Sequence, residues 1–434
     1  LPQETFTARI EDLAHDGRGI ARLEGKVVLV DGALPGEEVT FRYTVRHSGY
    51  DEGTVQTILK PAAQRVEPRC THFGVCGGCG LQHLEPGAQI RFKEAQLLDN
   101  LRRIGKVQPQ GVLPPLTADP WGYRRKARLG VKYVAKKGRV LVGFRERASP
   151  YIAALARCEV LHPRVGELLE PLGELIGGLS IYNRLPQIEV AVGDNAVGLS
   201  FRVLDPPSQS DCQLLTAFGQ RHDIWIYLQP KGPETTRLLW PEKGELVYRL
   251  SGLALELAFQ PYHFTQVNAA INESMIQQAL ELLDLNGRET VLDLFCGLGN
   301  FTLPLARKAA RVVGVEGDRS LVEWARRNAR RNAIDNAQFY SADLTASPAE
   351  QNWLKEDFQR VLLDPPRSGA LEMIPTLARL KAERIVYVSC HPATLARDAG
   401  QLVNCYGYRL QRAGVMDMFP HTAHVESIAL FVSP

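Results

Sequence analysis

Apolar and polar residues alternate in short runs over residues 4–60, and this pattern predicts an all-β segment. Runs such as KVVLV and EVTFRY are separated by the turn-forming stretches DGRG, LEG, DGALPGE and SGYDEG. Strands this short and this closely spaced are typical of a small barrel. The Pro-containing polar stretch 61–70 has the composition of a linker, and a helix is predicted over about 87–104.

From about residue 262 the pattern becomes a regular alternation of helix and strand. Helical periodicity in NESMIQQALELLDL and SLVEWARRNARRNA alternates with the apolar runs TVLDLF, RVVGVEG, RVLLDPP and RIVYVSC. This predicts an α/β fold with a mostly parallel sheet covered by helices on both faces, whose ligand lies beyond the carboxyl ends of the strands. The residues at those ends are Asp293, Glu316, Asp343, Asp364 and Cys390.

The length of 434 residues predicts about three domains, which we place at 1–62, 63–258 and 259–434. Hydrophobic content of 45% and charged content of 23% are those of a soluble globular protein. No run approaches roughly 18 apolar residues, and the first residues lack the pattern of a secretory leader. We therefore expect a cytoplasmic monomer without a membrane partner, an expectation that covers only residues 1–434.

Charge is distributed unevenly along the chain. Residues 1–150 carry 24 basic and 16 acidic side chains, a net charge of +8, whereas the remainder has a net charge of −5. The stretch 121–147 contains ten Lys and Arg with aromatic residues between them, which suits phosphate contacts and base stacking. The alternative is an amphipathic hairpin whose aromatic side chains lie in the core, and the two interpretations are compatible.

A glycine turn follows one predicted strand. VLDLFCGLGNF (291–301) places Gly297 and Gly299 between strand and helix, and Glu316 ends the next strand, where a carboxylate commonly binds ribose hydroxyls. The turn reads D-x-F-x-G-x-G rather than G-x-G-x-x-G, which argues against NAD. With acidic residues at successive strand ends, it resembles the S-adenosylmethionine site of class I methyltransferases.

Cys390 stands at the end of the predicted strand RIVYVSC. Pro392 donates no backbone N–H and disfavours helical geometry at His391, so the strand must end here. The thiol could be a buried spacer, a metal ligand or a nucleophile. Its position at the ligand crevice favours a chemical role.

The C-terminal motifs resemble those of the RNA uridine-5-methyltransferases. The matching segments are FTQVNAAIN, LDLFCGLGNFTLPLA, VVGVEG, LLDPPRSG, VYVSCHPATLARD and DMFPHTAHVES. One departure is His391, where the family usually has Asn. The resemblance implies that Cys390 is the nucleophile that adds to carbon 6 of uracil, and that Glu426 is the base that removes the carbon-5 proton. It also implies S-adenosylmethionine contacts at Gln266, Phe295, Asn300, Glu316, Asp343 and Asp364.

Three cysteines lie within ten residues in PRCTHFGVCGGCGLQH. Their C-x5-C-x2-C spacing is closer to the loops of iron–sulfur proteins than to paired zinc knuckles, although zinc stays an alternative. Cys158 is the candidate fourth ligand. By resemblance to the same relatives, Cys70, Cys76, Cys79 and Cys158 would hold a [4Fe-4S] cluster in a central α+β domain.

The N-terminal strands resemble a TRAM domain, an OB-like RNA-binding barrel. TRAM, iron–sulfur region and class I (Rossmann-like) methyltransferase together indicate the family members that methylate uridine 1939 of 23S ribosomal RNA. Alternatives are the same reaction at position 747 or at uridine 54 of tRNA, and a non-catalytic RNA-binding iron–sulfur protein. An amino-group methyltransferase using DPPR (364–367) would not need the thiol of Cys390.

Overall fold

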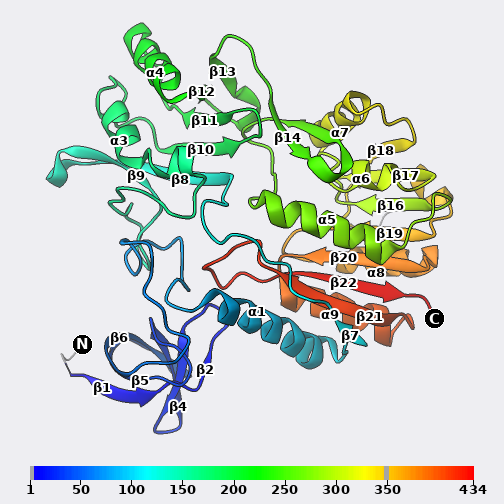
Figure 1. The fold of residues 1–434 in the computed structure, drawn as a ribbon, viewed down its shortest axis with the longest axis horizontal. Helices are drawn as coiled ribbons and strands as arrows, with labels where there is room; N and C mark the ends of the chain where they lie inside the picture. The colour runs from blue at the N-terminus through cyan, green and yellow to red at the C-terminus, as the bar shows by residue number, and fades with distance from the viewer. Residues whose placement is uncertain (1–3, 347–350) are drawn as a thin grey trace.

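The computed structural model describes residues 4–346 and 351–434, and its strands form three large sheets and one small one (Figure 1). The N-terminal sheet lies apart from the other two at the lower left of the view (Figure 1), and the C-terminal sheet occupies the right. Within these residues no helix combines the length and the apolar character that a bilayer span requires.

The N-terminal sheet curls around its own small core. Its strands are β1 (Phe6–Arg9), β2 (Asp12–Leu13), β3 (Gly19–Leu23), β4 (Lys26–Asp31), β5 (Glu38–Arg46) and β6 (Tyr50–Lys60). They are ordered β1-β5-β6-β4-β3-β2. Alternate residues point inward, so that Val28 and Val30 of β4 pack with Phe41 of β5 while their neighbours face outward.

Helices pack on one face of the central sheet. Its strands are β8 (Lys126–Val134), β9 (Arg139–Gly143), β10 (Gln187–Val192), β11 (Val197–Arg202), β12 (Ile224–Gln229) and β13 (Arg237–Trp240), in the order β13-β12-β11-β10-β8-β9. The neighbouring helices are α2 (Pro163–Gly166), α3 (Leu169–Gly177) and α4 (Gln209–His222). Leu172 of α3 and Phe218 of α4 share a core with Leu129 of β8. The opposite face of β8 carries polar residues.

The C-terminal sheet is parallel through its centre and antiparallel beyond. Its strands are β16 (Thr290–Leu294), β17 (Arg311–Glu316), β18 (Ala337–Ser341), β19 (Arg360–Leu363), β20 (Arg384–Ser389), β21 (Arg409–Met416), β22 (Glu426–Val432) and β7 (Gly111–Val112). The order is β18-β17-β16-β19-β20-β22-β21-β7, with β18 to β20 parallel and β22 antiparallel to both of its neighbours.

Helices cover both faces of this sheet, as the sequence pattern predicts. One face carries α5 (Ala269–Leu283), α6 (Thr302–Ala306) and α7 (Arg319–Arg331), and the other carries α1 (Pro86–Asn100), α8 (Ile374–Leu380) and α9 (Pro392–Asn404). Successive residues of β16 enter separate cores, with Val291 in the core that includes α5 and Leu292 in the core that includes α8 and α9. A hairpin of β14 (Leu246–Leu250) and β15 (Leu255–Phe259) is fastened to α7 by the Asn328 side chain, which accepts from the Ala258 amide at 2.9 Å.

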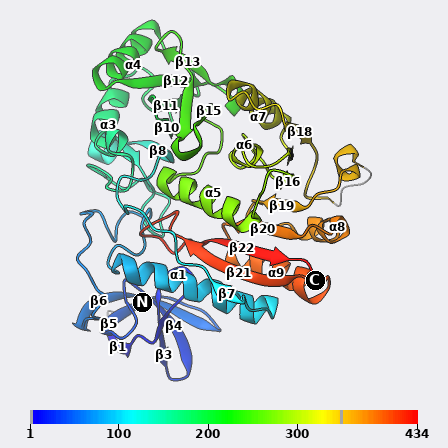
Figure 2. The ribbon, with the colours of Figure 1, turned by 45° about the vertical axis from the view of Figure 1, so that its right-hand side comes forward.

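A segment from the first third of the chain is built into the C-terminal sheet. Helix α1 lies along β21 and α9 (Figure 2), and β7 extends the sheet by pairing with β21. The π-helix Leu101–Gly105, which continues α1, approaches α9 closely, because a Cβ on Gly400 would meet the Gly105 carbonyl oxygen at 2.7 Å. The contact requires glycine at this crossing.

Helix α1 also carries a buried charge. The Lys93 ammonium, which has no exposed surface, donates to Asp417 Oδ1 at 2.6 Å and to the Phe419 carbonyl at 2.9 Å. Gln89, one turn earlier on the helix, accepts from the His421 amide at 2.8 Å. Helix α1 thereby holds the loop between β21 and β22 at several points.

We expect Lys93→Met to lower the free energy of unfolding by about 3–5 kcal/mol, because Asp417 would keep a buried, unpaired charge. The double variant Lys93→Met/Asp417→Leu should recover most of this loss, since it removes both charges. Urea denaturation of the two variants and the unmodified protein measures the difference. Equal stability of the single variant and the unmodified protein would contradict the pairing.

Candidate active site

Cys390 and Glu426 meet across two neighbouring strands. Cys390 directly follows β20, and Glu426 is the first residue of β22. In this antiparallel pair Ser389 lies opposite Ser427. One further step of the same register sets Cys390 opposite Glu426, and directly opposed residues share a face with Cβ atoms about 4.5–5.5 Å apart. The structure therefore brings this thiol and this carboxyl together at the carboxyl edge of the sheet.

The surroundings of this pair oppose negative charge. Burial, followed by the nearby Glu426 and Asp364, raises the pKa of Cys390 to about 11. Burial and Asp364 raise the pKa of Glu426 to about 8. Arg367, which follows β19, acts in the opposite direction on both groups and favours the thiolate and the carboxylate.

His391, the departure from the family pattern, caps helix α9. Its ring Nδ1 accepts from the Thr394 amide at 3.4 Å, so it fills the position that Asn commonly occupies at a helix N-terminus. Burial and Arg367 lower the pKa of His391, which keeps the ring neutral and able to accept. The substitution therefore preserves the local capping interaction beside the thiol.

Cys390 opens into a cavity of about 580 Å³ to which all three parts of the chain contribute. Arg367, His424 and Thr422 come from the C-terminal part. The other contributors lie far away in the sequence: His15, Asp16, Gly77, Cys79, Gly80, Gln96, Asn100 and Arg147. Arg367, Thr422 and His424 stand in motifs that the sequence analysis quotes, whereas His15, Asp16, Gln96 and Asn100 carry no local signal that sequence reasoning could have used.

The glycine turn after β16 is adjacent to this edge. Gly297 and Gly299 have positive φ angles of 53° and 93°, as the turn requires. Glu316, the last residue of β17, accepts from the Gly297 amide at 3.1 Å and thereby joins two strand ends. Asn300 accepts from Tyr248 Oη at 3.1 Å and exchanges two side-chain hydrogen bonds with Asn272.

The remaining predicted cofactor residues surround the turn at different depths. Gln266 lines a small cavity together with Tyr248 and Asn272, the two partners of Asn300. Phe295 is partly buried against the core at a positive φ of 64°. Asp343 lies beyond β18 and is exposed, its carboxylate bound by the amide and hydroxyl of Thr345. It is the outermost of the six.

Two carboxyls lie near the turn, the buried Asp293 and the half-buried Asp364. Asp293 Oδ2 accepts from the Thr302 hydroxyl at 2.5 Å, whereas Oδ1 has no hydrogen-bond partner among the residues that the structure describes. Burial is the main cause that raises the pKa of Asp293 to about 8 and of Asp364 to about 7. Buried carboxyls of this kind become anionic when a cationic ligand binds beside them.

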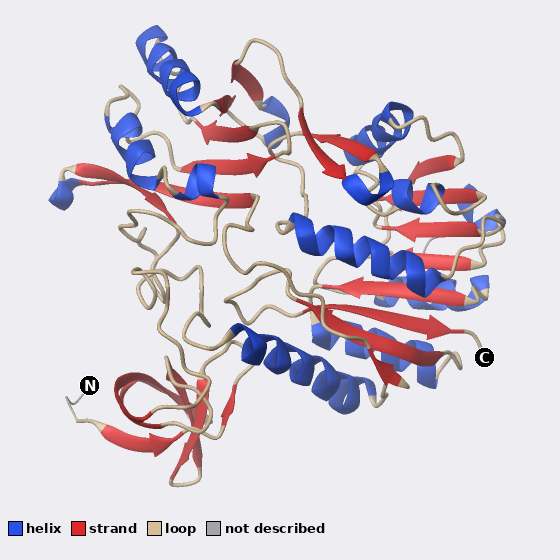
Figure 3. Cartoon of the chain, viewed as in Figure 1, coloured by secondary structure: helices blue, strands red, loops and turns tan. Residues whose placement is uncertain are grey.

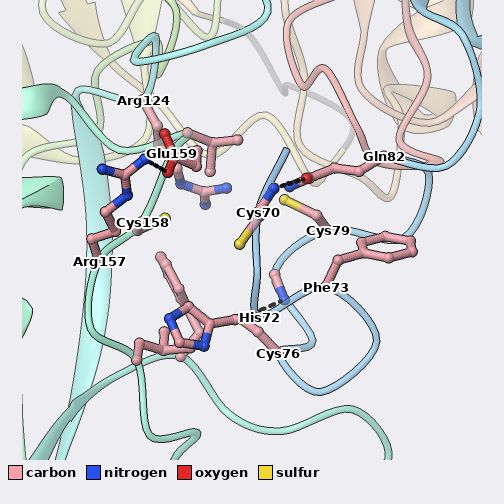
Figure 4. Close-up of a pocket in the computed structure, with 14 residues that line it drawn as sticks. Cys70, His72, Phe73, Cys76, Cys79, Gln82, Arg124, Arg157, Cys158 and Glu159 are labelled. Carbon is pink, nitrogen blue, oxygen red and sulfur yellow. Dashed lines mark hydrogen bonds and ion pairs between the residues drawn. The ribbon is translucent and has the colours of Figure 1, made fainter. Parts of the chain in front are cut away.

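The four predicted metal-ligating cysteines converge on one cavity (Figure 4). Cys70, Cys76 and Cys79 lie on one loop, and Cys158 faces them from a separate segment. Each is a free thiol. Burial raises the pKa of Cys79 to about 12 and that of Cys158 to about 11, and the neighbouring cysteines act in the same direction.

Backbone amides point at these sulfurs. The Gly78 amide donates to Cys76 Sγ at 3.4 Å, and the amides of Val160 and Leu161 act on Cys158. Across residues 4–346 and 351–434, no three or more His, Cys, Asp or Glu side chains are grouped closely enough to hold a metal ion. The loop thus supplies four converging thiols and amide donors, without a closed single-ion site.

The chain matches known proteins along its whole length. The family model described as tRNA (Uracil-5-)-methyltransferase matches residues 247–433, and the TRAM domain model matches residues 2–55. A protein of Nitrosococcus oceani is 57% identical over 433 residues, 99% of this chain and 97% of the relative. One of Alkalilimnicola ehrlichii is 55% identical over 432 residues, 99% and 97% of the two chains. Both are named 23S rRNA (uracil(1939)-C(5))-methyltransferase RlmD.

A solved structure has a similar arrangement. The Pyrococcus abyssi tRNA (uracil-54, C5)-methyltransferase in complex with S-adenosyl-L-homocysteine aligns with a TM-score of 0.75 and 26% sequence identity. The alignment covers 98% of this chain and 100% of that one. The similarity therefore extends over all parts of the molecule.

The buried carboxyls predict a pH-dependent stability of the ligand-free protein. Asp364 has a pKa of about 7 in the folded protein, against 3.8 as the ordinary value of an aspartate. Between these two pH values the unfolded protein loses the proton first, so the contribution of Asp364 to the free energy of unfolding falls as the pH rises. Asp364→Asn should therefore raise the Tm by an amount that grows from about pH 4 to pH 7 and then levels off. Thermal unfolding between pH 4 and 9 measures it, with exposed Asp343→Asn as the control. A pH-independent gain would contradict the raised pKa.

Proposed function

The chain belongs to the tRNA (uracil-5-)-methyltransferase family, and from this membership we propose that it methylates carbon 5 of uridine 1939 in 23S ribosomal RNA with S-adenosylmethionine as the methyl donor. Membership confirms the resemblance inferred from the C-terminal motifs and the fold class of a class I methyltransferase with an N-terminal TRAM domain. The relatives' names and their full-length similarity support the 23S target.

The opposition of Cys390 and Glu426 is the observation that carries the proposed chemistry. The thiolate of Cys390 adds to carbon 6 of uracil, and the ring electrons move to make carbon 5 nucleophilic. Carbon 5 takes the methyl group of S-adenosylmethionine, whose S–CH3 bond breaks and which leaves as S-adenosylhomocysteine. Glu426 then accepts the proton from carbon 5, and the electron pair left behind expels the Cys390 thiolate. Both reacting side chains must reach one pyrimidine ring, which the strand register supports.

Arg367 assists this sequence electrostatically. It lies near both reacting groups and lowers the free energy of their charged forms. Its guanidinium also bonds His424 Nδ1 at 3.3 Å, in the loop that leads to Glu426. We assign it the role of stabilising the thiolate while the target base is bound.

The cofactor residues proposed are the six around the glycine turn. Glu316 would accept hydrogen bonds from the ribose hydroxyls, and Gln266 lies beside Tyr248 and Asn272, the two hydrogen-bond partners of Asn300. Asp293 and Asp364 offer buried carboxyls to a ligand whose sulfonium and ammonium are positive. Asp343 and Phe295 complete the set from the rim of the turn.

A [4Fe-4S] cluster held by Cys70, Cys76, Cys79 and Cys158 is part of the proposal. The four thiols surround one cavity, and amide donors directed at cysteine sulfurs are a common feature of such clusters. A single zinc ion bound by the same four thiolates, with Zn–S bonds of about 2.3 Å, is the alternative.

We further assign one role to each proposed domain: RNA binding to 1–62, cluster and RNA binding to 63–258, and methyl transfer to 259–434. We also propose a monomer as the active form. The same reaction at position 747 or in tRNA is the main alternative, because the similar solved structure acts on tRNA. Mapping 5-methyluridine in ribosomal and transfer RNA of a deletion strain separates these targets.

Two substitutions should separate the roles of the reacting pair. Cys390→Ala should abolish methylation while both substrates still bind, because no bond to carbon 6 can form. Glu426→Gln should accumulate a protein–RNA adduct that survives denaturing gels and carries the donor's methyl label, since elimination requires loss of the carbon-5 proton. Normal turnover by Glu426→Gln would contradict the assigned base. The exposed Cys405→Ala is the matched control and should remain active.

Anaerobically purified protein should contain about four iron and about four acid-labile sulfide per chain and absorb visible light. Cys158→Ser should lose the iron as completely as Cys76→Ser, whereas Cys405→Ser should retain it. Metal analysis and visible spectroscopy provide the readouts. Stoichiometric zinc without iron would overturn the cluster.

A further inference from the structure

The central sheet has an open face that the proposed chemistry does not use. A groove of about 800 Å³ lies over strands β8 and β9 on the side away from α3 and α4. Along β8, Ala127, Leu129 and Val131 enter the core, so Arg128, Gly130 and Lys132 must face the groove. The alternation that builds the core therefore also builds this second surface.

The groove is strongly basic. Its charged lining residues are Arg128, Lys132, Lys137, Arg145 and Glu146. Glu146 is the single carboxylate among them within the described part of the chain, and only Arg128 is held by a neighbouring acid, Glu189, at 2.7 Å. Lys132, Lys137 and Arg145 are exposed. Such an arrangement attracts a polyanion.

An aromatic side chain stands at the rim. Tyr151 is 71% exposed, the highest value among the exposed large hydrophobic residues of the described chain. Its neighbour Ile152 packs over Gly130, because a Cβ at that glycine would meet Ile152 Cδ1 at 2.4 Å. Ile152 thereby anchors the segment and holds Tyr151 outward, where a base can stack on its ring.

The segment 144–152 forms a wall of both cavities. Arg147 lines the cavity of Cys390 and pairs with Asp31 of the N-terminal sheet at 2.6 Å. Arg145 lines the basic groove, and its carbonyl accepts from the Gly77 amide of the cysteine loop at 2.9 Å. The Glu146 amide donates to the Tyr151 carbonyl at 2.8 Å, which closes the segment into a hairpin. An RNA strand that leaves the cavity beside Cys390 can pass directly over the segment 144–152.

We propose that the groove over β8 and β9 binds the single-stranded RNA that flanks the target uridine, with phosphates on Lys132, Lys137 and Arg145 and a base stacked on Tyr151. This inference rests on the proposed function. The groove acts on affinity for the extended RNA and has no part in bond making, because it holds none of the residues at the strand edge where Cys390 lies.

The test compares two RNAs containing the target uridine: a short fragment, and the same fragment with single-stranded flanks on both sides. Lys132→Glu/Lys137→Glu should raise KM for the flanked RNA by about 10-fold or more, with kcat and the KM for the short RNA unchanged. The slope of log affinity against log salt should fall by about 1.4, or about 0.7 for each phosphate that the variant no longer neutralises. The matched control is Arg221→Glu/Arg237→Glu, which reverses two exposed cations that lie away from the groove, on α4 and on the far edge strand β13.

Tyr151 gives an independent readout. Tyr151→Ala should weaken binding of the flanked RNA by about 10-fold, and Tyr151→Phe should retain it, because stacking needs the ring and not the hydroxyl. Because Tyr151 is exposed, neither substitution should disturb folding, and equal Tm values of the variants and the unmodified protein would verify this. Photocrosslinking of 4-thiouridine in the flank to Tyr151 would support the proposal directly.

The outcomes distinguish this inference from the function on which it rests. If the unmodified enzyme methylates both RNAs and the groove variants bind the flanked RNA normally, the groove assignment is overturned. If the unmodified enzyme methylates neither RNA, the proposed function itself fails. An equal loss of affinity for the flanked RNA in the control variant would show that net charge alone causes the effect, and this result would also overturn the groove assignment.

Discussion

The antiparallel pairing of β22 with β20 is the constraint on which the candidate active site depends. It sets the first residue of β22, Glu426, opposite Cys390 at the edge where the parallel strands end. A slip of one residue would turn Glu426 to the other face of the sheet, because side chains alternate along a strand. Register in turn is held by the buried alternation of β22, whose Ala429 and Phe431 enter one core while Ile428 and Leu430 enter the other.

The loop before β22 is held by parts of the chain far from it in sequence. Lys93 and Gln89 of α1 bind Asp417, Phe419 and His421 of this loop. The amides of Gly80 and Leu81, directly after Cys79, both donate to the His421 carbonyl at 2.9 Å. The cysteine loop is thus connected through one short segment to the proposed base. Order in that loop and the position of Glu426 are physically linked, which gives a structural reason for placing cysteines so near the reaction cavity.

Acidic and basic side chains are concentrated in different regions of the molecule. The crevice side holds three buried or half-buried carboxyls with raised pKa values, at Asp293, Asp364 and Glu426, and this favours cationic ligands and proton acceptance. The N-terminal third presents the excess of basic residues, including the groove over β8 and β9. A cationic methyl donor and an anionic RNA are therefore attracted by different groups of residues. Figure 3 shows loops at the centre of the view, between the C-terminal sheet and the other two large sheets.

Local pattern determined the elements and the motif positions. The helix–strand alternation, the glycine turn after β16 and the termination of β20 before Pro392 are short-range properties, so the sequence predicted where Glu316 and Cys390 would stand. Only the tertiary structure decided which residues face one another. The pairing of Glu426 with Cys390, the insertion of α1 and β7 into the C-terminal sheet, and the shared wall formed by Arg145 and Arg147 join segments distant in sequence. Such contacts depend on strand register and core packing over the whole chain, which no local pattern encodes.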